Sequence, residues 1–305
     1  MMLVHTSLAW NLDEKSMLER IRQHLVPPSR NASQLRQPTR RFFSQFRQDE
    51  YFWRLFDRPF VLPRGSQGFF VESGAFDGEW LSNTLALERE RGWTGLLIEP
   101  DPANQKVLLS KQRNAWIFRG GLSTAKSEDS LVRFRLDRTP NTTAGGLSAL
   151  DMIKKGKRGG MLRGHRYEYE NAYVAPLDAI LRAIDVHTVD FWSIDIEGAE
   201  AMVLDATDFG RIEVGLIEIE TDQTARVEQI LGRAHGCNFS KVGMWDGQEG
   251  DAFYINRSYF ATRHVDTVAV VAQNSTPREY LVGLDSSSRG IAHGSSAHGL
   301  HVHGA

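Results

Sequence analysis

The chain lacks several features that mark specialised classes of protein. Its 305 residues include a single cysteine, Cys237, so no disulfide can form within the chain, as is usual in a reducing compartment. No run reaches the ~18 apolar residues that a membrane-spanning helix needs. The N-terminal residues carry no basic segment before their short apolar start, so we expect no signal peptide and a cytoplasmic location.

The chain also lacks a large excess of positive or negative charge, because its formal net charge is −2. This balance argues against nucleic acid as the partner, because nucleic-acid-binding domains are usually basic. Residues 36–47 are an exception, because they carry four arginines and three phenylalanines. Two interpretations of this Arg/Phe patch stay open: a surface that grips nucleic acid or an anionic substrate, or an amphipathic helix whose phenylalanines pack on the core.

What is present divides the chain into three parts. We expect an N-terminal extension over residues 1–40, one α/β domain over 41–260, and a C-terminal extension over 261–305 that ends in a disordered Ser/Gly/His tail. In the first part, Leu18, Ile21 and Leu25 have helical spacing.

From residue 67 onward, apolar strand-like runs alternate with helical patterns, which is typical of a mostly parallel sheet flanked by helices. The expected strands are 68–73, 94–99, 115–119, 189–195, 212–219, 238–243 and 251–256; the expected helices are 81–91, 102–112, 177–184, 199–206 and 224–235. Between about 120 and 173 the alternation stops in a stretch rich in glycine and cations. We expect this stretch to be an insertion that forms a lid.

The loop after the first of these strands points to the ligand. It carries Glu72, Gly74, Asp77 and Gly78, and it lacks the G-x-G-x-x-G fingerprint of dinucleotide-binding proteins. Two carboxylates would repel a pyrophosphate and attract a ligand with a positive end. S-adenosylmethionine is such a ligand, because it has an α-ammonium group near a sulfonium.

A second acidic position ends the next strand. Glu99 is placed to accept hydrogen bonds from the two hydroxyls of an adenosine ribose, a group that NAD and S-adenosylmethionine share. Glu99 therefore predicts a cofactor of this kind without choosing between them. The alternative role for Glu99 is to cap the helix that begins at Pro102.

A third acidic group lies within the run "VDFWSIDIEGAEAMVL". Asp195 ends the expected strand, and Glu197 follows two residues later. These two carboxylates could hold the cofactor ammonium, bind a metal, or act as a base for an acceptor hydroxyl. Glu200 falls in the first turn of the next helix, where an acid stabilises the helix N-terminus.

Taken together, "FVESGAFDGEWLSNTLALE", "GWTGLLIEPDP", "VDFWSIDIEGAEAMVL" and "DAFYINR" resemble the FkbM-type S-adenosylmethionine-dependent methyltransferases. "SQFRQDEYF" resembles an element of the same family just before the first strand. The resemblance implies a Rossmann-like class I methyltransferase fold with a seven-stranded sheet, and O-methylation of sugars or small molecules. It implies cofactor-binding roles for Glu72, Gly74, Asp77, Gly78, Asn83 and Glu99. Asp195 and Glu197 match the acidic pair of the family's fourth strand.

The chemistry at the acceptor stays open at this point. Asp195, Glu197 and His165 are candidates for a base, the last because it lies among arginines in the expected insertion. A divalent metal on Asp195 and Glu197 is conceivable, with Glu218 or Glu220 as a further ligand. Two rival functions are an NAD-type oxidoreductase, which would lack its glycine fingerprint, and a catalytically silent binding module. The sequence indicates neither the acceptor nor the oligomeric state.

Overall fold

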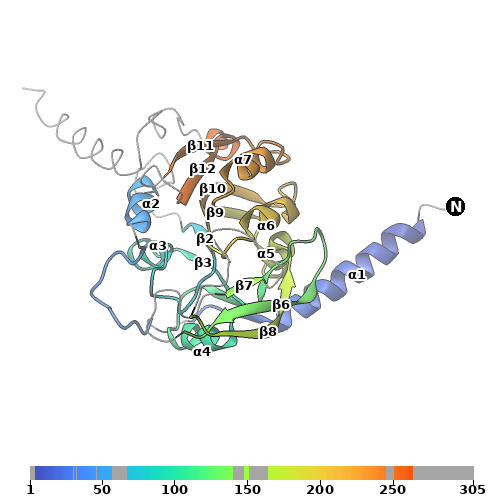
Figure 1. The fold of residues 1–305 in the computed structure, drawn as a ribbon. Helices are drawn as coiled ribbons and strands as arrows, with labels where there is room; N and C mark the ends of the chain where they lie inside the picture. The colour runs from blue at the N-terminus through green and yellow to red at the C-terminus, as the bar shows by residue number, and fades with distance from the viewer. Residues whose placement is uncertain are drawn as a thin grey trace, which may run out of the picture.

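The structure is a computed structural model that describes residues 4–29, 31, 33–45, 47–56, 67–139, 148–150, 164–244 and 251–263. Its centre is a twisted sheet of eight strands (Figure 1). In spatial order the strands are β1 (Leu25–Val26), β4 (Trp116–Arg119), β3 (Thr94–Glu99), β2 (Phe69–Ser73), β9 (Thr188–Ile194), β10 (Glu213–Glu220), β12 (Asp251–Asn256) and β11 (Phe239–Met244).

The pairing of these strands confirms the predicted α/β class. The pairs from β4 through β3, β2 and β9 to β10 are parallel, whereas β12 and β11 run antiparallel. All seven predicted strands are present within one or two residues of their expected bounds. The eighth strand, β1, comes from the N-terminal part of the chain and pairs antiparallel with the outer edge of β4.

Helices cover both faces of this sheet, as parallel strands require. The predicted helices are confirmed as α3 (Leu85–Arg91), α4 (Pro102–Ser110), α5 (Leu177–Ala183), α6 (Glu200–Ala206) and α7 (Thr224–Leu231). The N-terminal helical pattern forms α1 (Val4–Gln23), and α2 (Gln48–Phe56) and α8 (Arg257–Thr262) were not predicted. Helix α3 begins four residues later than expected, because residues 81–84 form a turn on Glu72.

Two apolar cores lie on the two faces of the sheet. On one face, Trp192 and Ile217 pack in a cluster with residues of α5, α6, α7 and α1. On the other face, Phe70, Phe191 and Phe253 pack with residues of α2, α3 and α8. Residues Met17 and Ile21 of α1 are buried in the first core, so the helix is anchored there while its beginning projects from the body (Figure 1).

The stretch from 120 to 173 builds a second, smaller sheet. Its spatial order is β5 (Gly121–Leu122), β8 (Tyr167–Ala175), β6 (Ser130–Asp137) and β7 (Ser148–Leu150). Phe134 and Leu136 of β6 pack against Ala199, which follows β9. The second sheet therefore sits beside the carboxyl end of β9. Residues 140–147 and 151–163 of this stretch lie outside the described residues, and the role of the stretch as a lid stays a prediction.

The Arg/Phe patch is irregular where it is described, so the expectation of an amphipathic helix is wrong for residues 36–45. Phe43 is nevertheless buried in the protein. The guanidinium of Arg41 lies over the ring of Trp53 at 4.3 Å, and Arg89 donates hydrogen bonds to the carbonyls of Pro38 and Arg40. Arg41 thus packs locally, whereas Arg36 and Arg47 are exposed; Phe46 lies outside the described residues.

Candidate functional site at the carboxyl ends of the strands

The two glycines of the first loop are required by its backbone. Gly74 has φ +88°, and a Cβ atom there would lie 1.9 Å from the carbonyl oxygen of Asp195. Gly78 has φ +77°, and a Cβ atom there would lie 2.4 Å from the side chain of Leu108. The glycines therefore let the chain after β2 pass directly against the end of β9, a close approach that no larger residue permits.

Glu72 is bonded within the protein on both carboxylate oxygens. It accepts hydrogen bonds from the backbone amide of Asn83 at 2.8 Å, the hydroxyl of Ser82 at 2.9 Å and the hydroxyl of Thr84 at 2.5 Å. Burial raises the pKa of this carboxyl, while the positive charge of Arg113 and these donors act to lower it. Glu72 thus fixes the turn between β2 and α3.

Asp77 has a similar role one turn later. Its carboxylate accepts hydrogen bonds from the amides of Glu79 at 2.9 Å and Trp80 at 2.7 Å, and it lies 3.9 Å from the buried ammonium of Lys111. Arg36 approaches the same carboxylate at 3.8 Å. In this structure the two acidic groups of the loop hold the loop in shape.

Asn83 connects the first loop to the fourth parallel strand of the sheet. Its amide nitrogen donates to the hydroxyl of Ser193 on β9 at 3.0 Å. Its amide oxygen is buried and has no hydrogen-bond partner among the described residues. The structure therefore places Asn83 between the ends of β2 and β9, with one acceptor atom left over.

Glu99 ends β3 directly beside the first loop. It accepts hydrogen bonds from the backbone amides of Phe76 and Asp101, both at 2.9 Å. Burial raises the pKa of this carboxyl to about 8, against the effect of those amides. The helix that follows is capped by Asp101, whose side chain accepts from the amide of Ala103 at 2.9 Å. The capping role considered for Glu99 thus belongs to its neighbour.

Asp195 and Glu197 differ in position. Asp195 is exposed, and its amide donates to the carbonyl of Ser73 at 3.1 Å, so it stands at the mouth between β2 and β9. Glu197 is half-buried and has φ +59°. Glu200 is buried and accepts from the amides of Ile196 and Gly198, and burial raises its pKa to about 7. Glu200 therefore closes the turn before α6.

His165 lies at the end of the second sheet and is paired with an acid. Its Nδ1 atom is 2.6 Å from a carboxylate oxygen of Asp137, which also accepts from the amide of Thr139. Arg138, which follows Asp137 in the chain, donates a hydrogen bond to the carboxylate of Asp101. The backbone amide of Asp101 in turn donates to the carboxylate of Glu99. These contacts bring the second sheet to the end of β3.

Several residues of the site gave no recognisable signal in the sequence. Arg113 is buried and donates to Glu88 at 2.7 Å and Thr84 at 3.3 Å, so it supplies positive charge beneath the first loop. Ser193 on β9 and Asp251 on β12 are buried polar residues on the two strands that flank β10. Glu218, noted above only as a conceivable metal ligand, is 2% exposed. Such roles depend on strand register, which a single sequence does not show.

The metal hypothesis finds little support in this arrangement. Within the described ranges, no three His, Cys, Asp or Glu side chains are grouped so that they could hold a metal ion. A search of the same residues finds no helix long and apolar enough to cross a membrane.

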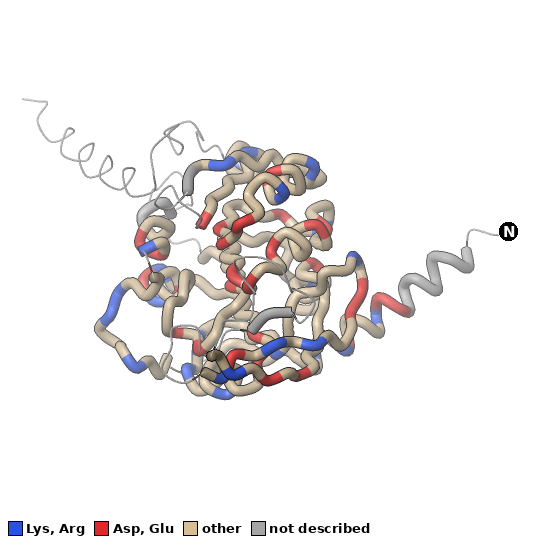
Figure 2. Tube along the Cα trace, in the orientation of Figure 1, with Lys and Arg blue, Asp and Glu red and all other residues tan. Residues whose placement is uncertain are grey.

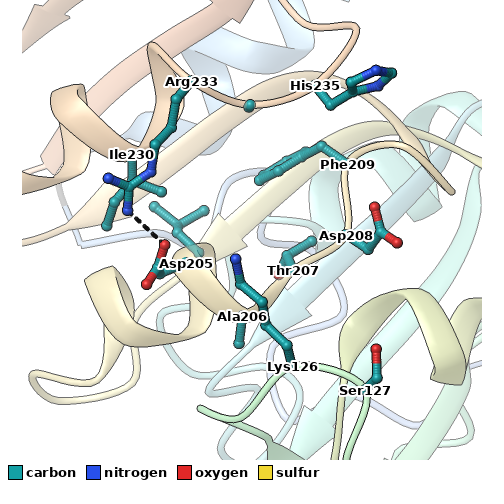
Figure 3. Close-up of a pocket in the computed structure, with 12 residues that line it drawn as sticks. Lys126, Ser127, Asp205, Ala206, Thr207, Asp208, Phe209, Ile230, Arg233 and His235 are labelled. Carbon is teal, nitrogen blue, oxygen red and sulfur yellow. Dashed lines mark hydrogen bonds and ion pairs between the residues drawn. The ribbon is translucent and has the colours of Figure 1, made fainter.

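A separate pocket lies at the far end of α6 from these residues (Figure 3). It is lined in part by Lys126, Phe209 and His235, and the ion pair between Arg233 and Asp205 measures 2.7 Å. Helix α6 begins near the carboxyl end of β9 and leads away from it. The pocket at the far end of α6 therefore lies away from the carboxyl ends of the strands. We assign it no part in the site.

Polar residues at the carboxyl ends of parallel strands, around a glycine loop, define a cofactor-binding α/β protein. Residues 72–241, more than half of the chain, match the family model described as Methyltransferase FkbM domain, and the chain belongs to this family. Family membership implies S-adenosylmethionine as the methyl donor.

Two solved structures illustrate the likeness. One is methyltransferase FkbM from Methylobacillus flagellatus KT, with 16% identity over 68% of this chain and 50% of that chain and a TM-score of 0.37. The other is precorrin-6y C5,15-methyltransferase from Geobacter metallireducens GS-15, with 12% identity over 74% of this chain and 92% of that chain and a TM-score of 0.34. The chain thus spans about half the length of the first. No curated protein matches it.

Proposed function

We propose that this protein transfers a methyl group from S-adenosylmethionine to a hydroxyl of a sugar or small metabolite. The observation that carries the proposal is the contact between the first loop and Asp195. Gly74 brings the loop against the carbonyl of Asp195, while the amide of Phe76 in the same loop bonds Glu99. A cofactor lying over this loop would therefore have an acid at each end.

In this proposal Glu99 accepts hydrogen bonds from the ribose, and Asp195 faces the positively charged end of the cofactor. Gly74 and Gly78 have no side chains, so the cofactor can lie directly against the backbone of the loop. Glu72 and Asp77 act indirectly, because their oxygens already bond the loop. Asn83 holds the far edge of the cofactor site through Ser193.

The reaction needs alignment and a proton acceptor. The acceptor oxygen forms a bond to the methyl carbon while the carbon–sulfur bond breaks, and the sulfonium becomes a neutral thioether. The hydroxyl proton passes to a base, which we assign to Asp195 because it is exposed at the mouth beside the loop. Glu197 and His165 are the next candidates, and Asp137 would orient the imidazole of His165.

The test is a methyl-transfer assay with methyl-labelled S-adenosylmethionine against a panel of sugars and hydroxylated metabolites. We expect label in at least one hydroxylated acceptor, and transfer slower by a factor on the order of 100 with the Asp195→Asn variant. Thermal shift with S-adenosylhomocysteine and with NAD separates the rivals. Stabilisation by NAD alone would favour the oxidoreductase, and cofactor binding without transfer to any acceptor would favour the silent binding module.

A further inference from the structure

Three buried oxygen atoms near the ends of β9 and β10 have no hydrogen-bond donor at close range. Both carboxylate oxygens of Glu218 and the amide oxygen of Asn83 are shielded from solvent and have no hydrogen-bond partner within 3.5 Å among the described residues. Leaving a buried acceptor unpaired is costly, and a buried carboxylate without a partner is more so. An arrangement of this kind therefore needs an explanation.

The three oxygens belong to one neighbourhood. Glu218 stands opposite Ser193 in the pairing of β10 with β9, and Ser193 stands opposite Glu72 in the pairing with β2. Residues level with one another on adjacent strands point to the same face of a sheet. The amide nitrogen of Asn83 donates to the Ser193 hydroxyl from that face. Asn83 and Glu218 thus meet at Ser193.

Acidic groups surround this point. Besides burial, the pKa of Glu218 is raised by the negative charges of Asp251, Glu72 and Asp195, while a hydrogen bond from the hydroxyl of Ser193 acts to lower it. This single weak donor cannot satisfy both oxygens of the carboxyl group. Asp251, on β12, accepts a hydrogen bond at 2.5 Å from the side chain of Gln48. Gln48 belongs to α2, the helix that packs on this face of the sheet. No lysine or arginine of the described chain is among the main groups that act on Glu218.

The chemistry of the missing ligand follows from these atoms. A primary ammonium group has three N–H donors, no acceptor and one positive charge, whereas a hydroxyl has only one donor. We propose that Glu218 and the Asn83 amide oxygen, with Asp251 beside them, form a binding pocket for a primary ammonium group. This inference rests on the proposed function, because it adds a specificity pocket to the same site.

Two molecules of the reaction could bring such a group. One is the cofactor, through its α-ammonium; the other is an acceptor that carries an amino group as well as a hydroxyl. The cofactor would lie over β3, β2 and β9, and Glu218 is on the next strand, β10. The pocket is therefore within reach of either molecule, and the experiment separates them.

The probe is methylammonium chloride, added to the full chain at pH 7.5 and compared with sodium chloride at equal ionic strength. We expect a saturable rise in Tm of about 3–6 °C at ten times the Kd. The Glu218→Gln variant keeps the shape of the side chain and removes its charge, so it should lose this rise. Asp251→Asn should weaken it, and Asp205→Asn, which changes an exposed acid elsewhere, should leave it intact.

Repeating the titration with saturating S-adenosylhomocysteine identifies the source. If the effect of methylammonium disappears, the cofactor's own ammonium fills the pocket; if the effect persists, the pocket serves an amino group of the acceptor. An absent rise in the wild type, or an equal rise in Glu218→Gln, would overturn the proposal. Failure of S-adenosylhomocysteine to bind would instead count against the proposed function.

Discussion

The acidic residues on the two sides of the site at the strand ends differ in their burial and their hydrogen bonding. On the β2–β3 side, Glu72 and Glu99 accept hydrogen bonds from amides and hydroxyls, and the buried Arg113 supplies positive charge. On the β9–β10 side, Asp195 is exposed and Glu218 is buried without a hydrogen-bond partner within 3.5 Å in the described chain. Figure 2 shows acidic positions recurring through the middle of the molecule, where the strands lie.

This difference indicates a division of labour. Acids that are fully bonded build a rigid loop, and a rigid loop can receive a cofactor without reorganising. A buried acid without close donors, such as Glu218, lowers the stability of the free protein and is retained where a ligand compensates it. We therefore propose that the β2–β3 side receives the adenosine part of the cofactor and that the β9–β10 side faces its charged end and the acceptor.

The largest effect is expected where an acid on the bonded side is removed. Glu72→Ala leaves three buried donors without an acceptor, so the free energy of unfolding should fall by about 3–5 kcal/mol. Urea denaturation measures the change. Asp205→Ala is the control, because it breaks only a surface ion pair worth less than about 1 kcal/mol. A similar small loss in Glu72→Ala would mean that Glu72 does not hold the loop.

Asp195→Asn tests the other side. It should leave the unfolding free energy nearly unchanged, because the side chain is exposed, and lower kcat by a factor on the order of 100 if the carboxylate takes the acceptor proton. Steady-state kinetics with the acceptor found in the panel measures this. Weaker cofactor binding with normal kcat would instead assign Asp195 to the cofactor ammonium, and normal values of both would move the base to Glu197 or His165.

The pH dependence of cofactor binding sharpens the assignment of Glu99. Its pKa is raised to about 8 by burial, and only the carboxylate can accept two ribose hydrogen bonds. The affinity for S-adenosylhomocysteine should therefore rise by up to about tenfold per pH unit below 8 and level off above it. Glu99→Gln, which does not titrate, should flatten the profile. The same slope in both proteins would exclude Glu99 as its source.

The smallest expected effect is a gain in stability on removing an acid. Burial and neighbouring acids raise the pKa of Glu218 in the folded state above its unfolded value. The stability that Glu218 contributes is therefore complete below the unfolded pKa and is lost as the pH rises toward the folded value. Glu218→Gln should thus increase the free energy of unfolding by about 1 kcal/mol at pH 7.5. A clear loss of stability would show that Glu218 has a structural partner.

The sequence predicted the strands well, because they depend on local pattern, and it placed the proposed cofactor residues next to those strands. The loop with Gly74 and Gly78 follows a strand directly, and the acid Glu99 ends the next one. The β9–β10 side was predicted less well: Asp195 was found, but Ser193 and Asp251 were not. Their meeting with Glu218 depends on the register of β9, β10 and β12, which lie far apart in the chain.

The strands of the insertion could not be predicted from the sequence pattern either. Arg133 and Tyr169 belong to paired strands of the second sheet, whereas the sequence between 120 and 173 predicted an insertion that forms a lid and no strands within it. The strands β6 and β8 are separated by residues rich in glycine and lysine, so the usual signal of a short hairpin turn is missing. Only the three-dimensional pairing reveals them.

The most direct test of the central claim is a calorimetric titration of S-adenosylhomocysteine into the wild type, Glu99→Ala and Asp205→Ala. We predict binding of one molecule to the wild type and to Asp205→Ala with equal affinity. Glu99→Ala should bind about 1–3 kcal/mol more weakly, the scale of a lost hydrogen bond to a charged group. No binding to the wild type, or the same affinity in Glu99→Ala, would contradict a cofactor site over β2 and β3.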